Sequence, residues 1–463
     1  MLILFRTCEL ARATITKLSQ RILCEAPGLE IAVAHQEFSW NERSIGGEKE
    51  GVHHQLYQTL NQAKQQRCSS APLLGLGVTL ECTATGLPAV GSTRSQGQDD
   101  PPRPASAEVL VKQQHRDAAQ ARFKQIFGEL IADYNIPLDF DELGGTRDEM
   151  RYIAVVHADG NGMGKRFQDV IKQHSGVAQN RACLNALRDL SIAVDQAGMQ
   201  ALKATVKRMM ERFKEDQSEA MRAFLEGLRD AKTNKINLPF RPIVYGGDDV
   251  TFVCDGRIGL SLARIYLEEW EQATKNDATL GPPAYACAGV AIVKTRYPFV
   301  RAYELAEALC KGAKQQLLEG GSGDASALDW HFAMGGIGGT LKQIREREYQ
   351  AKEGELYLRP VGLRAGVLGP TWYSWAAFDR TIRAFQNNSA WRERRNKVKQ
   401  LREVLREGAN AVERFRIAFN IPLLPELDQT KPDLQEKGWY GNHCGYFDAI
   451  EALDFYLPLT EEG

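Results

Sequence analysis

The chain has 463 residues, of which 43% are hydrophobic, and its 58 basic and 59 acidic residues give a net charge of −1. A chain of this length is expected to fold into two or three globular domains rather than one. The balanced charge excludes a chain-wide field that recruits nucleic acid or an anionic membrane, so any polyanion must be bound locally.

The sequence carries no targeting or membrane signal. It has no run of about 18 apolar residues, and Arg6 and Glu9 interrupt its short apolar start. Its nine cysteines are scattered without a CxxC pair, which is typical of buried reduced thiols and not of a zinc ribbon. We therefore expect a cytoplasmic protein without membrane association.

The first part of the chain, 1–105, is predicted to be a small α/β domain that ends in a linker. Hydrophobic periods near two and 3.6 predict strands over 2–5, 29–38 and 74–82 and helices over 8–23 and 53–67. The stretch 91–106 is rich in Gly, Ser, Asp and Pro and indicates an exposed linker. A helix over about 107–134 then belongs to a helical connector, 106–150.

A second α/β unit is predicted over 151–338. Its strand 152–159 is apolar on both faces, as an interior strand should be. We expect the following elements to be a helical region over about 176–232, a hairpin, a helix over 260–274, a strand over 285–294, a helix over 301–319 and a last strand near 327–332. The order β, α, β, β, α, β, with one more short strand, predicts a ferredoxin-like antiparallel sheet with helices on one face.

The remainder, 339–463, is predicted to be a helical domain. A helix expected over 391–416 carries basic side chains, from Arg392 to Arg416, on one side and leucines and valines on the other. We interpret the basic side as the solvated face of an amphipathic helix. The alternative is a surface that docks RNA phosphates or an acidic partner.

Two adjacent carboxylates, Asp248 and Asp249, stand between two strand-forming runs in "VYGGDDVTFVCDG". Because the first and third strands of a ferredoxin-like sheet are antiparallel neighbours, Asp159 at the end of strand 152–159 is expected to meet both of them. Three unpaired carboxylates repel one another, and a divalent metal ion resolves that cost. Two such ions about 3.5 to 4 Å apart activate a hydroxyl and stabilise a leaving pyrophosphate, so the cluster predicts nucleotidyl transfer.

Glycines beside these carboxylates favour nucleotide binding. Gly246 and Gly247 permit positive φ and the close approach of a base or ribose. In "ADGNGMGK", the backbone amides of Gly160, Gly162 and Gly164 precede a helix, where a triphosphate is favoured.

Three lysines are candidates for neutralising phosphate oxygens, namely Lys165, Lys311 and Lys314. The last two lie three residues apart and hence on one helix face. Ordinary exposed lysines are the alternative. His157 shares a strand face with Asp159, and we interpret it as a packed histidine rather than a site residue.

The motifs "YIAVVHADGNGMGK", "YGGDDVTFVC" and "CAGVAIVKTRYPFVRAYELAEALCKGAK", in this order, resemble the catalytic second palm domain of the large subunit of type III CRISPR effector complexes. The resemblance covers about residues 151–334. Residues 1–90 would correspond to the family's noncatalytic first palm and 339–463 to its helical carboxyl-terminal region. The fold class that it implies is α+β, with two ferredoxin-like palm domains followed by a helical domain.

The resemblance implies a metal-dependent nucleotidyltransferase that makes cyclic oligonucleotide second messengers in antiviral defence, with cyclic oligoadenylate from ATP as the first expectation. It implies Asp159, Asp248 and Asp249 as catalytic residues, and the same three with Gly160 as ligands of two Mg²⁺ or Mn²⁺ ions. The nucleotide-binding residues would be Gly160, Asn161, Gly162, Gly164, Lys165, Gly246, Gly247, Lys311 and Lys314. The implied partners are CRISPR effector subunits, guide or target RNA and a downstream effector of the cyclic nucleotide, and a homo-oligomer stays open.

The sequence departs from the family's pattern in two respects. It has no HD dipeptide, and it lacks the family's zinc-binding cysteine pairs, with only Cys82 near the corresponding place. We therefore expect no nuclease activity and no structural zinc, and a standalone synthase without a CRISPR complex stays open. The alternatives are a noncatalytic scaffold that senses nucleotides or holds RNA-bound subunits and, ranked last, an RNA-templated polymerase.

Overall fold

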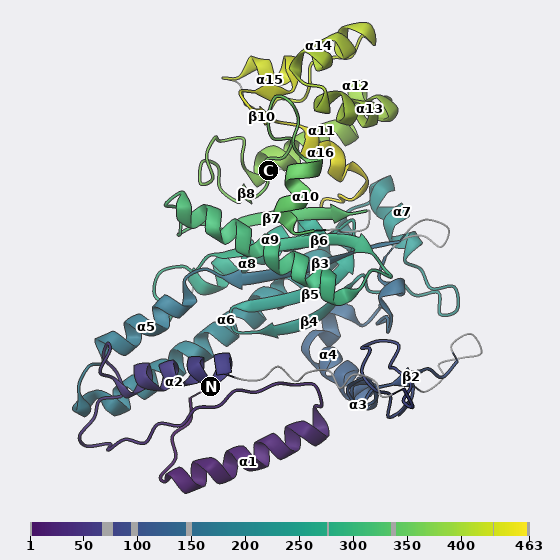
Figure 1. Cartoon of the computed structure of the whole chain (residues 1–463). Helices are drawn as coiled ribbons and strands as arrows, with labels where there is room; N and C mark the ends of the chain where they lie inside the picture. The colour runs from purple at the N-terminus through teal and green to yellow at the C-terminus, as the bar shows by residue number, and fades with distance from the viewer. Residues whose placement is uncertain are drawn as a thin grey trace. The chain divides into compact units, whose positions relative to one another are not determined.

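The computed structural model describes residues 2–66, 77–93, 101–144, 151–275, 277–334, 339–428 and 430–460. It has the predicted α+β class, and its chain divides into two compact units (Figure 1). Unit 1 comprises Met1–Gly128 and Lys165–Arg188, and unit 2 comprises Glu129–Gly164 and Asp189–Gly463. The division of the chain at about residues 105, 150 and 338 stays a prediction. Among the described residues, no helix is long and apolar enough to cross a membrane.

Helices make up most of the described part of unit 1. They are α1 (Cys8–Glu25), α2 (Val52–Gln66), α3 (Ala107–Gln114) and most of α4 (Arg116–Ile131) and α5 (Met163–Gln173). The predicted helices 8–23 and 53–67 correspond to α1 and α2, and the predicted helix 107–134 is divided between α3 and α4. A short antiparallel ladder joins β1 (Gly91–Ser92) to β2 (Pro104–Ala105), within the stretch predicted to be a linker.

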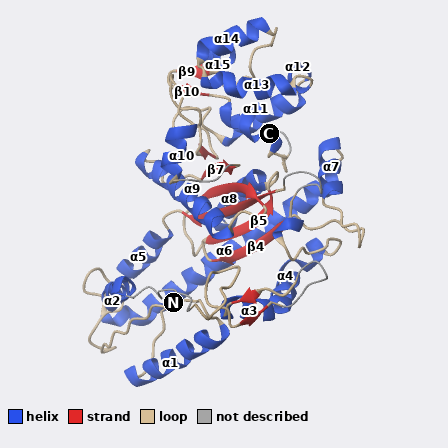
Figure 2. Ribbon diagram, turned by 45° about the vertical axis from the view of Figure 1, so that its right-hand side comes forward, coloured by secondary structure: helices blue, strands red, loops and turns tan. Residues whose placement is uncertain are grey.

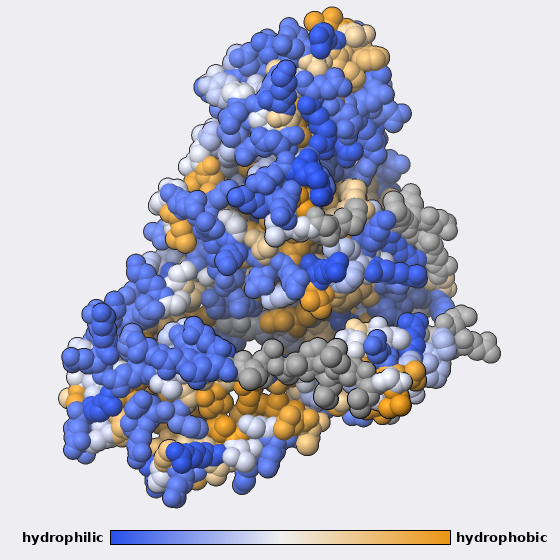
Figure 3. All heavy atoms as spheres, in the orientation of Figure 1, coloured by the Kyte–Doolittle hydropathy of each residue, from blue (hydrophilic) through white to orange (hydrophobic). Residues whose placement is uncertain are grey.

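The strands predicted over 2–5 and 29–38 are wrong. Both segments are described, and neither forms a strand. The apolar side chains of Leu2, Ile3, Leu4 and Leu29 are exposed. Figure 3 shows hydrophobic surface in the part of the molecule where Figure 1 draws the amino-terminal segments. Alternation predicts a strand only where a neighbour takes up the backbone hydrogen bonds, and the described residues supply none here. The third predicted strand, 74–82, lies partly outside the described residues, and its described part from Gly77 to Cys82 contains only an isolated bridge at Glu81.

Unit 2 is built on a six-stranded sheet with the order β4-β5-β3-β6-β7-β8 (Figure 2). The strands are β3 (Tyr152–Gly160), β4 (Phe240–Gly246), β5 (Asp249–Asp255), β6 (Ala286–Lys294), β7 (Ala327–Ala333) and β8 (Val361–Gly362). Only β6 and β7 pair in parallel. The order β6-β3-β5-β4 is the ferredoxin-like arrangement that the sequence predicts.

The sheet is covered by helices on both faces rather than on one. Helix α8 (Gly259–Lys275) packs on the face of Ala154, since a Cβ at Gly259 would lie 2.2 Å from the Ala154 Cβ. Helix α9 (Phe299–Glu319) packs on the opposite face, where Ile153 and Val155 share one buried cluster with α9 side chains. The crossover from β6 to the parallel strand β7 requires this placement of α9, because a parallel pair needs a connection outside the sheet plane.

The helical region predicted over about 176–232 contains two main helices, α6 (Asn180–Glu215) and α7 (Glu219–Gly227). In unit 2, α6 packs against the hairpin of β4 and β5, because a Cβ at Gly198 would lie 2.2 Å from the Gly247 carbonyl oxygen.

The carboxyl-terminal region is mainly helical, as predicted. Its helices are α10 (Leu341–Glu348), α11 (Trp375–Asn387), α12 (Ser389–Arg392), α13 (Arg395–Arg406), α14 (Ala409–Ala418), α15 (Pro432–Lys437) and α16 (Phe447–Glu451), with a small hairpin of β9 (Trp439–Tyr440) and β10 (His443–Cys444).

A buried arginine ties this region to the sheet. Arg359 is 1% exposed; its guanidinium lies 3.0 Å from a Glu451 carboxylate oxygen and 3.5 Å from one of Asp448, and it also lies over the Trp330 ring of β7. A buried charge must be paired to be tolerated, so these contacts fix α16 against the sheet.

The single helix predicted over 391–416 is wrong. The chain breaks it into α12, α13 and α14, and Gly408 at the second break has φ +100°. The Glu353 carboxylate accepts a hydrogen bond from the Ala409 amide at 2.7 Å and so caps α14. Several of the basic side chains bind within the chain: Arg395 and Lys399 pair with Asp454, and Arg394, Arg406 and Arg416 donate to backbone carbonyls. These bonds occupy five of the basic side chains that could otherwise contact RNA.

Two glycines, Gly289 of β6 and Gly312 of α9, allow a matched test of the packing between these two elements. A Cβ at Gly289 would lie 2.0 Å from the Ala306 carbonyl oxygen, whereas a Cβ at Gly312 meets nothing within 4 Å. We expect Gly289→Ala to lower the free energy of unfolding by about 1–3 kcal/mol or more through overpacking. Gly312→Ala should raise it by up to about 1 kcal/mol, because alanine favours a helix over glycine. Chemical denaturation measures both, and equal effects of the two substitutions would contradict this packing.

Candidate functional site

Asp159 and Asp249 face each other across two neighbouring strands. Strands β3 and β5 are antiparallel, and their register runs from Ile153 opposite Asp255 to Asp159 opposite Asp249. The neighbouring strands that the sequence predicts are thus present. Asp159 is the last residue but one of β3 and Asp249 is the first of β5, so both carboxylates lie at the same end of these paired strands.

The hairpin adds the third carboxylate. Gly246 pairs with Asp249, which leaves Gly247 and Asp248 as a two-residue loop. Gly246 and Gly247 have φ of +151° and +69°, so both use the conformational freedom predicted for them. The Gly160 amide donates to the Asp248 carbonyl oxygen at 3.1 Å, and a Cβ at Gly160 would lie 2.8 Å from the Asp248 Cβ. Only glycine lets the loop lie this close to the end of β3.

Lys314 supplies the positive charge of the cluster. It projects from α9, and its Nζ forms an ion pair with Asp159 Oδ2 and donates to the Gly160 carbonyl oxygen at 2.9 Å. Its side chain is 21% exposed. A cation is therefore held against the same oxygens that the sequence proposes as metal ligands.

The carboxylates perturb one another's protonation. Desolvation, a hydrogen bond to Asp159 and the charges of Asp159 and Asp248 together raise the pKa of Asp249 to about 7, against the partial opposition of Lys314. Desolvation also raises the pKa of Asp248, and the charge of Asp159 adds to it. Elevated carboxyl pKa values of this kind are typical of functional sites.

The predicted nucleotide-binding residues Asn161, Gly162 and Gly164 lie in the bend after β3 and at the start of α5. The Asn161 amide donates to the Tyr285 carbonyl oxygen at 2.7 Å, and its side chain donates to the Ala325 carbonyl oxygen at 2.9 Å. These bonds fix the bend after β3. Gly162 has φ +68° in the turn, and Gly164 is exposed in α5.

The three candidate lysines have different environments in the structure. Lys314 joins the carboxylates, and Lys311 is exposed one turn earlier on α9. Lys165 is exposed in α5 and belongs to unit 1, so its role with a nucleotide stays a prediction.

His157 is packed, as interpreted from the sequence. It is 9% exposed, its Nδ1 lies 3.1 Å from Thr251 Oγ1, and its ring lies edge to face with Tyr303. Desolvation lowers its pKa, which favours a neutral ring.

The sequence did not point to Asp195 or Tyr266. Asp195 lies on α6 and accepts a hydrogen bond from the Gly247 amide at 3.3 Å, so it supports the hairpin loop. Tyr266 on α8 is buried, and its pKa is raised by desolvation and by the three carboxylates. Neither residue lies in a recognisable motif, because helix packing alone brings each of them to the hairpin.

The donor set partly fits a divalent metal ion. Carboxylate and carbonyl oxygens from Asp159, Asp248, Asp249 and Gly160 are the hard ligands that Mg²⁺ and Mn²⁺ take. Within the described ranges, however, no group of three or more His, Cys, Asp or Glu side chains is arranged to hold an ion. Lys314 already engages two of the four proposed ligands. The chemistry therefore fits a metal, and the metal sites stay a prediction.

Comparison with protein families gives one match for this part of the chain. Residues 152–319 match the model of the second palm domain of Cas10/Cmr2. This part of the chain is therefore similar to the second palm domain of Cas10/Cmr2. The match contains the three carboxylates, the hairpin and both lysines of α9, which is the region of the resemblance seen in the sequence.

Solved structures that are similar to the chain include Csm1-Csm4 cassettes. The one in complex with cA4 is 15% identical, with a TM-score of 0.35, and the match covers 68% of this chain and 37% of that chain. The one in complex with one ATP is 15% identical, with a TM-score of 0.37 and coverages of 69% and 38%. The chain thus spans well under half the length of these chains. Comparison with curated proteins finds no match.

The raised pKa of Asp249 predicts a stability effect that depends on pH. Its pKa of about 7 lies above the value near 4 of a free aspartate, so the folded state holds a proton that the unfolded state releases. Stability that depends on the protonated form is present at low pH and is lost as the pH rises through 7. In EDTA, Asp249→Asn should therefore raise the melting temperature at pH 8 and have a smaller effect at pH 5. Asp169→Asn, at an exposed position of α5, is the control, and an Asp249→Asn gain that stays constant with pH would contradict the assignment.

Proposed function

We propose that the palm domain is the catalytic part of a nucleotidyltransferase that makes cyclic oligonucleotides, with cyclic oligoadenylate from ATP as the expected product. The observation that carries this proposal is the meeting of Asp159, Asp248 and Asp249 at one sheet edge, with Lys314 against Asp159 and Gly160. A structural ion pair would need one carboxylate per lysine. Three carboxylates on one cation leave excess negative charge, which divalent metal ions would balance.

The reaction forms a bond between the 3′-oxygen of one nucleotide and the α-phosphorus of another. The bond from that phosphorus to the bridging oxygen breaks, pyrophosphate leaves, and the proton of the 3′-hydroxyl passes to solvent. Two Mg²⁺ or Mn²⁺ ions, held by the three aspartates and the Gly160 carbonyl oxygen, would activate the hydroxyl and stabilise the leaving group.

The chain's own residues position the substrate. Gly246 and Gly247 leave the hairpin without side chains beside the carboxylates, so that a ribose or base lies against the backbone. Lys314 would exchange its contact with Asp159 for a phosphate oxygen, since an ammonium binds either anion. Asn161 and Asp195 hold the two loops in place through backbone hydrogen bonds.

The Cas10/Cmr2 palm match supports a place among type III CRISPR effector subunits, and such subunits with their RNA are the proposed partners. A cytoplasmic effector that responds to the product is part of the same proposal. The noncatalytic scaffold has less support, because several of the basic side chains expected to dock RNA bind within the chain instead.

Removal of the paired aspartates tests the activity. Purified protein is incubated with each nucleoside triphosphate and Mg²⁺ or Mn²⁺, with and without candidate RNA activators, and the products are identified by mass spectrometry. We expect Asp248→Ala with Asp249→Ala to reduce turnover by at least about a hundredfold, because the metal ligands are lost. Thermal unfolding should show an intact fold. Unchanged turnover in the double variant would refute the proposed site.

The two lysines of α9 form a matched pair for phosphate binding. Lys314→Met should lower turnover about tenfold or more, because it removes a charge-assisted contact at the cluster. Lys311→Met, one turn earlier and exposed, should have a smaller effect on kcat/KM. Steady-state kinetics on both variants measures the difference, and a larger loss for Lys311→Met would place the phosphates elsewhere on α9.

A further inference from the structure

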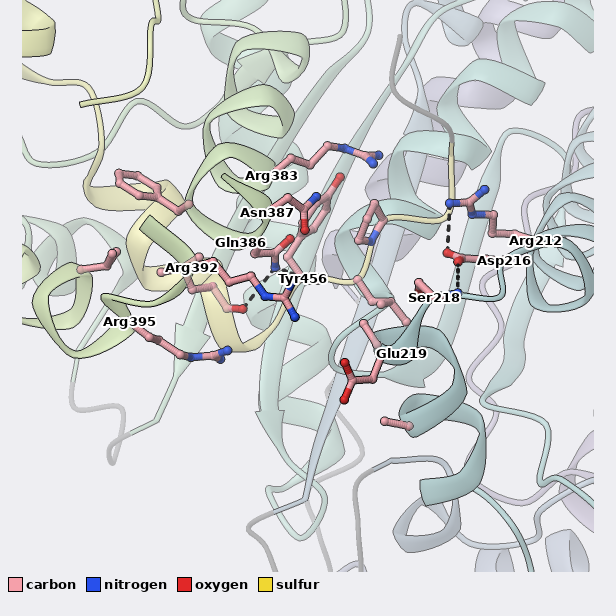
Figure 4. Close-up of a pocket in the computed structure, with 17 residues that line it drawn as sticks. Arg212, Asp216, Ser218, Glu219, Arg383, Gln386, Asn387, Arg392, Arg395 and Tyr456 are labelled. Atoms are coloured by element: carbon pink, nitrogen blue, oxygen red, sulfur yellow. Dashed lines mark hydrogen bonds and ion pairs between the residues drawn. The ribbon is translucent and has the colours of Figure 1, made fainter. Parts of the chain in front are cut away.

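A cavity lies in unit 2, between α7 and the helices α11 to α13 (Figure 4). Its volume is about 980 Å³. The end of α6 and the start of α7 form one wall, α11, α12 and α13 form the other, and the segment from Leu453 to Pro458 lies between them. None of the predicted nucleotide or metal residues lines it.

Four arginines line this cavity: Arg212, Arg383, Arg392 and Arg395. Two carboxylates, Asp216 and Glu219, also line it, and Arg212 pairs with Asp216. Among the described residues Arg392 has no carboxylate partner, and a guanidinium without a counter-charge favours an anion. The cavity is therefore suited to an anion.

Two of the arginines are held in place by partners outside the cavity wall. Arg383 donates to Asp379 at 2.8 Å and to the Thr460 carbonyl oxygen at 2.8 Å, and Arg395 pairs with Asp454. Neither Asp379 nor Asp454 is among the lining residues. A guanidinium has five N–H donors in a rigid fork, so these bonds fix its position and leave other donors for a ligand.

Arg212 and Arg392 have unused donors as well. Arg212 pairs with Asp216 at 3.0 Å, while its Nε is buried and has no hydrogen-bond partner in the described part of the chain. Arg392 has no ion pair or side-chain hydrogen bond with any described residue, and its guanidinium extends into the cavity (Figure 4). The Arg392 guanidinium therefore has donors available for charge-assisted hydrogen bonds to an anion in the cavity.

The first turn of α7 faces the same space. The Ser218 hydroxyl accepts a hydrogen bond from the Met221 amide at 3.2 Å and caps the helix. The first amide to donate within the helix is that of Arg222, to the Ser218 carbonyl oxygen at 3.0 Å, so the amides of the lining residues Glu219 and Ala220 have no acceptor in the helix. The helix dipole adds partial positive charge at this end.

The cavity wall also has a carboxylate, an amide and apolar side chains, which can contact the uncharged part of a ligand. Glu219 projects from α7 towards the cavity and pairs with no described side chain (Figure 4). Phe385, Val398 and Leu457 add apolar surface, and Asn387 adds an amide. A ligand with phosphates for the arginines, a flat apolar ring and N–H groups for Glu219 matches this combination.

We propose that this cavity binds a phosphate-bearing ligand of nucleotide size, at a site separate from the palm carboxylates. The proposal does not depend on the proposed function, because none of its residues takes part in that reaction. Small-molecule sites are typically pockets of several hundred cubic ångströms that have apolar walls and a few convergent polar groups, and this cavity has both features.

Calorimetry on the full chain in EDTA tests the proposal, with ATP and inorganic tripolyphosphate as separate probes. Arg392→Gln should weaken both about tenfold or more, because one charge-assisted contact is lost. Arg402→Gln is the matched control, since Arg402 lies on α13 but does not line the cavity. Glu219→Gln should tighten tripolyphosphate binding, because it removes a like charge.

Equal affinity of wild type and Arg392→Gln for both probes would overturn the proposal, and so would an equal loss in Arg402→Gln. If the wild-type chain binds a short single-stranded RNA more tightly than either probe, and Arg392→Gln loses that binding, then RNA and not a small molecule is the ligand, and the proposal is overturned. Photolabelling of the wild-type chain with 8-azido-ATP gives an independent readout. Label is expected within 212–223, 383–398 or 453–458, and label confined to other peptides would refute the site.

Discussion

The antiparallel register of β3 and β5 is the constraint on which the palm site depends. It sets Asp159 directly opposite Asp249, where paired Cα atoms lie about 4.5–5.5 Å apart, and the two-residue hairpin adds Asp248 beside Gly160. A slip of one residue would turn one of these carboxylates to the other face of the sheet. The register is specified by the apolar residues of both strands, so core packing also determines the distance between the charges.

The position of Lys314, whose ammonium balances part of the charge of the carboxylates, depends on packing as well. Helix α9 reaches Asp159 only because Gly289 lets it lie directly on β6, and the Cys310 thiol donates to the Cys287 carbonyl oxygen at 3.1 Å on the same contact. Lys314 follows Cys310 by one helical turn, which brings its ammonium to the sheet edge. A backbone contact in the core thus positions the cation that moderates repulsion among the carboxylates.

The sequence predicted the elements whose pattern is strong and local. Strands β3, β5 and β6 are nearly continuous apolar runs, α9 repeats apolar residues every three or four positions, and the glycines of the hairpin mark its turn. The prediction failed where contacts with distant parts of the chain determine the secondary structure. Residues 29–38 alternate like a strand but lack a neighbouring strand, and the end of α13 depends on Gly408 and on a distant carboxylate, Glu353. Asp195 and the arginine cavity arise from contacts between segments far apart in the chain, so no local pattern marks them.

Helix α6 contacts both the palm hairpin and the arginine cavity. Asp195 accepts the Gly247 amide at one point, and Arg212 lines the cavity about 25 Å further along the axis, at a rise of 1.5 Å per residue. A packed helix moves as one body, because its internal hydrogen bonds resist local stretching. Its buried residues Ala201, Val206 and Met210 hold the intervening turns in the core. Ligand contacts at Arg212 and loop contacts at Asp195 therefore act on the same rigid element, which gives the two sites a physical link within unit 2.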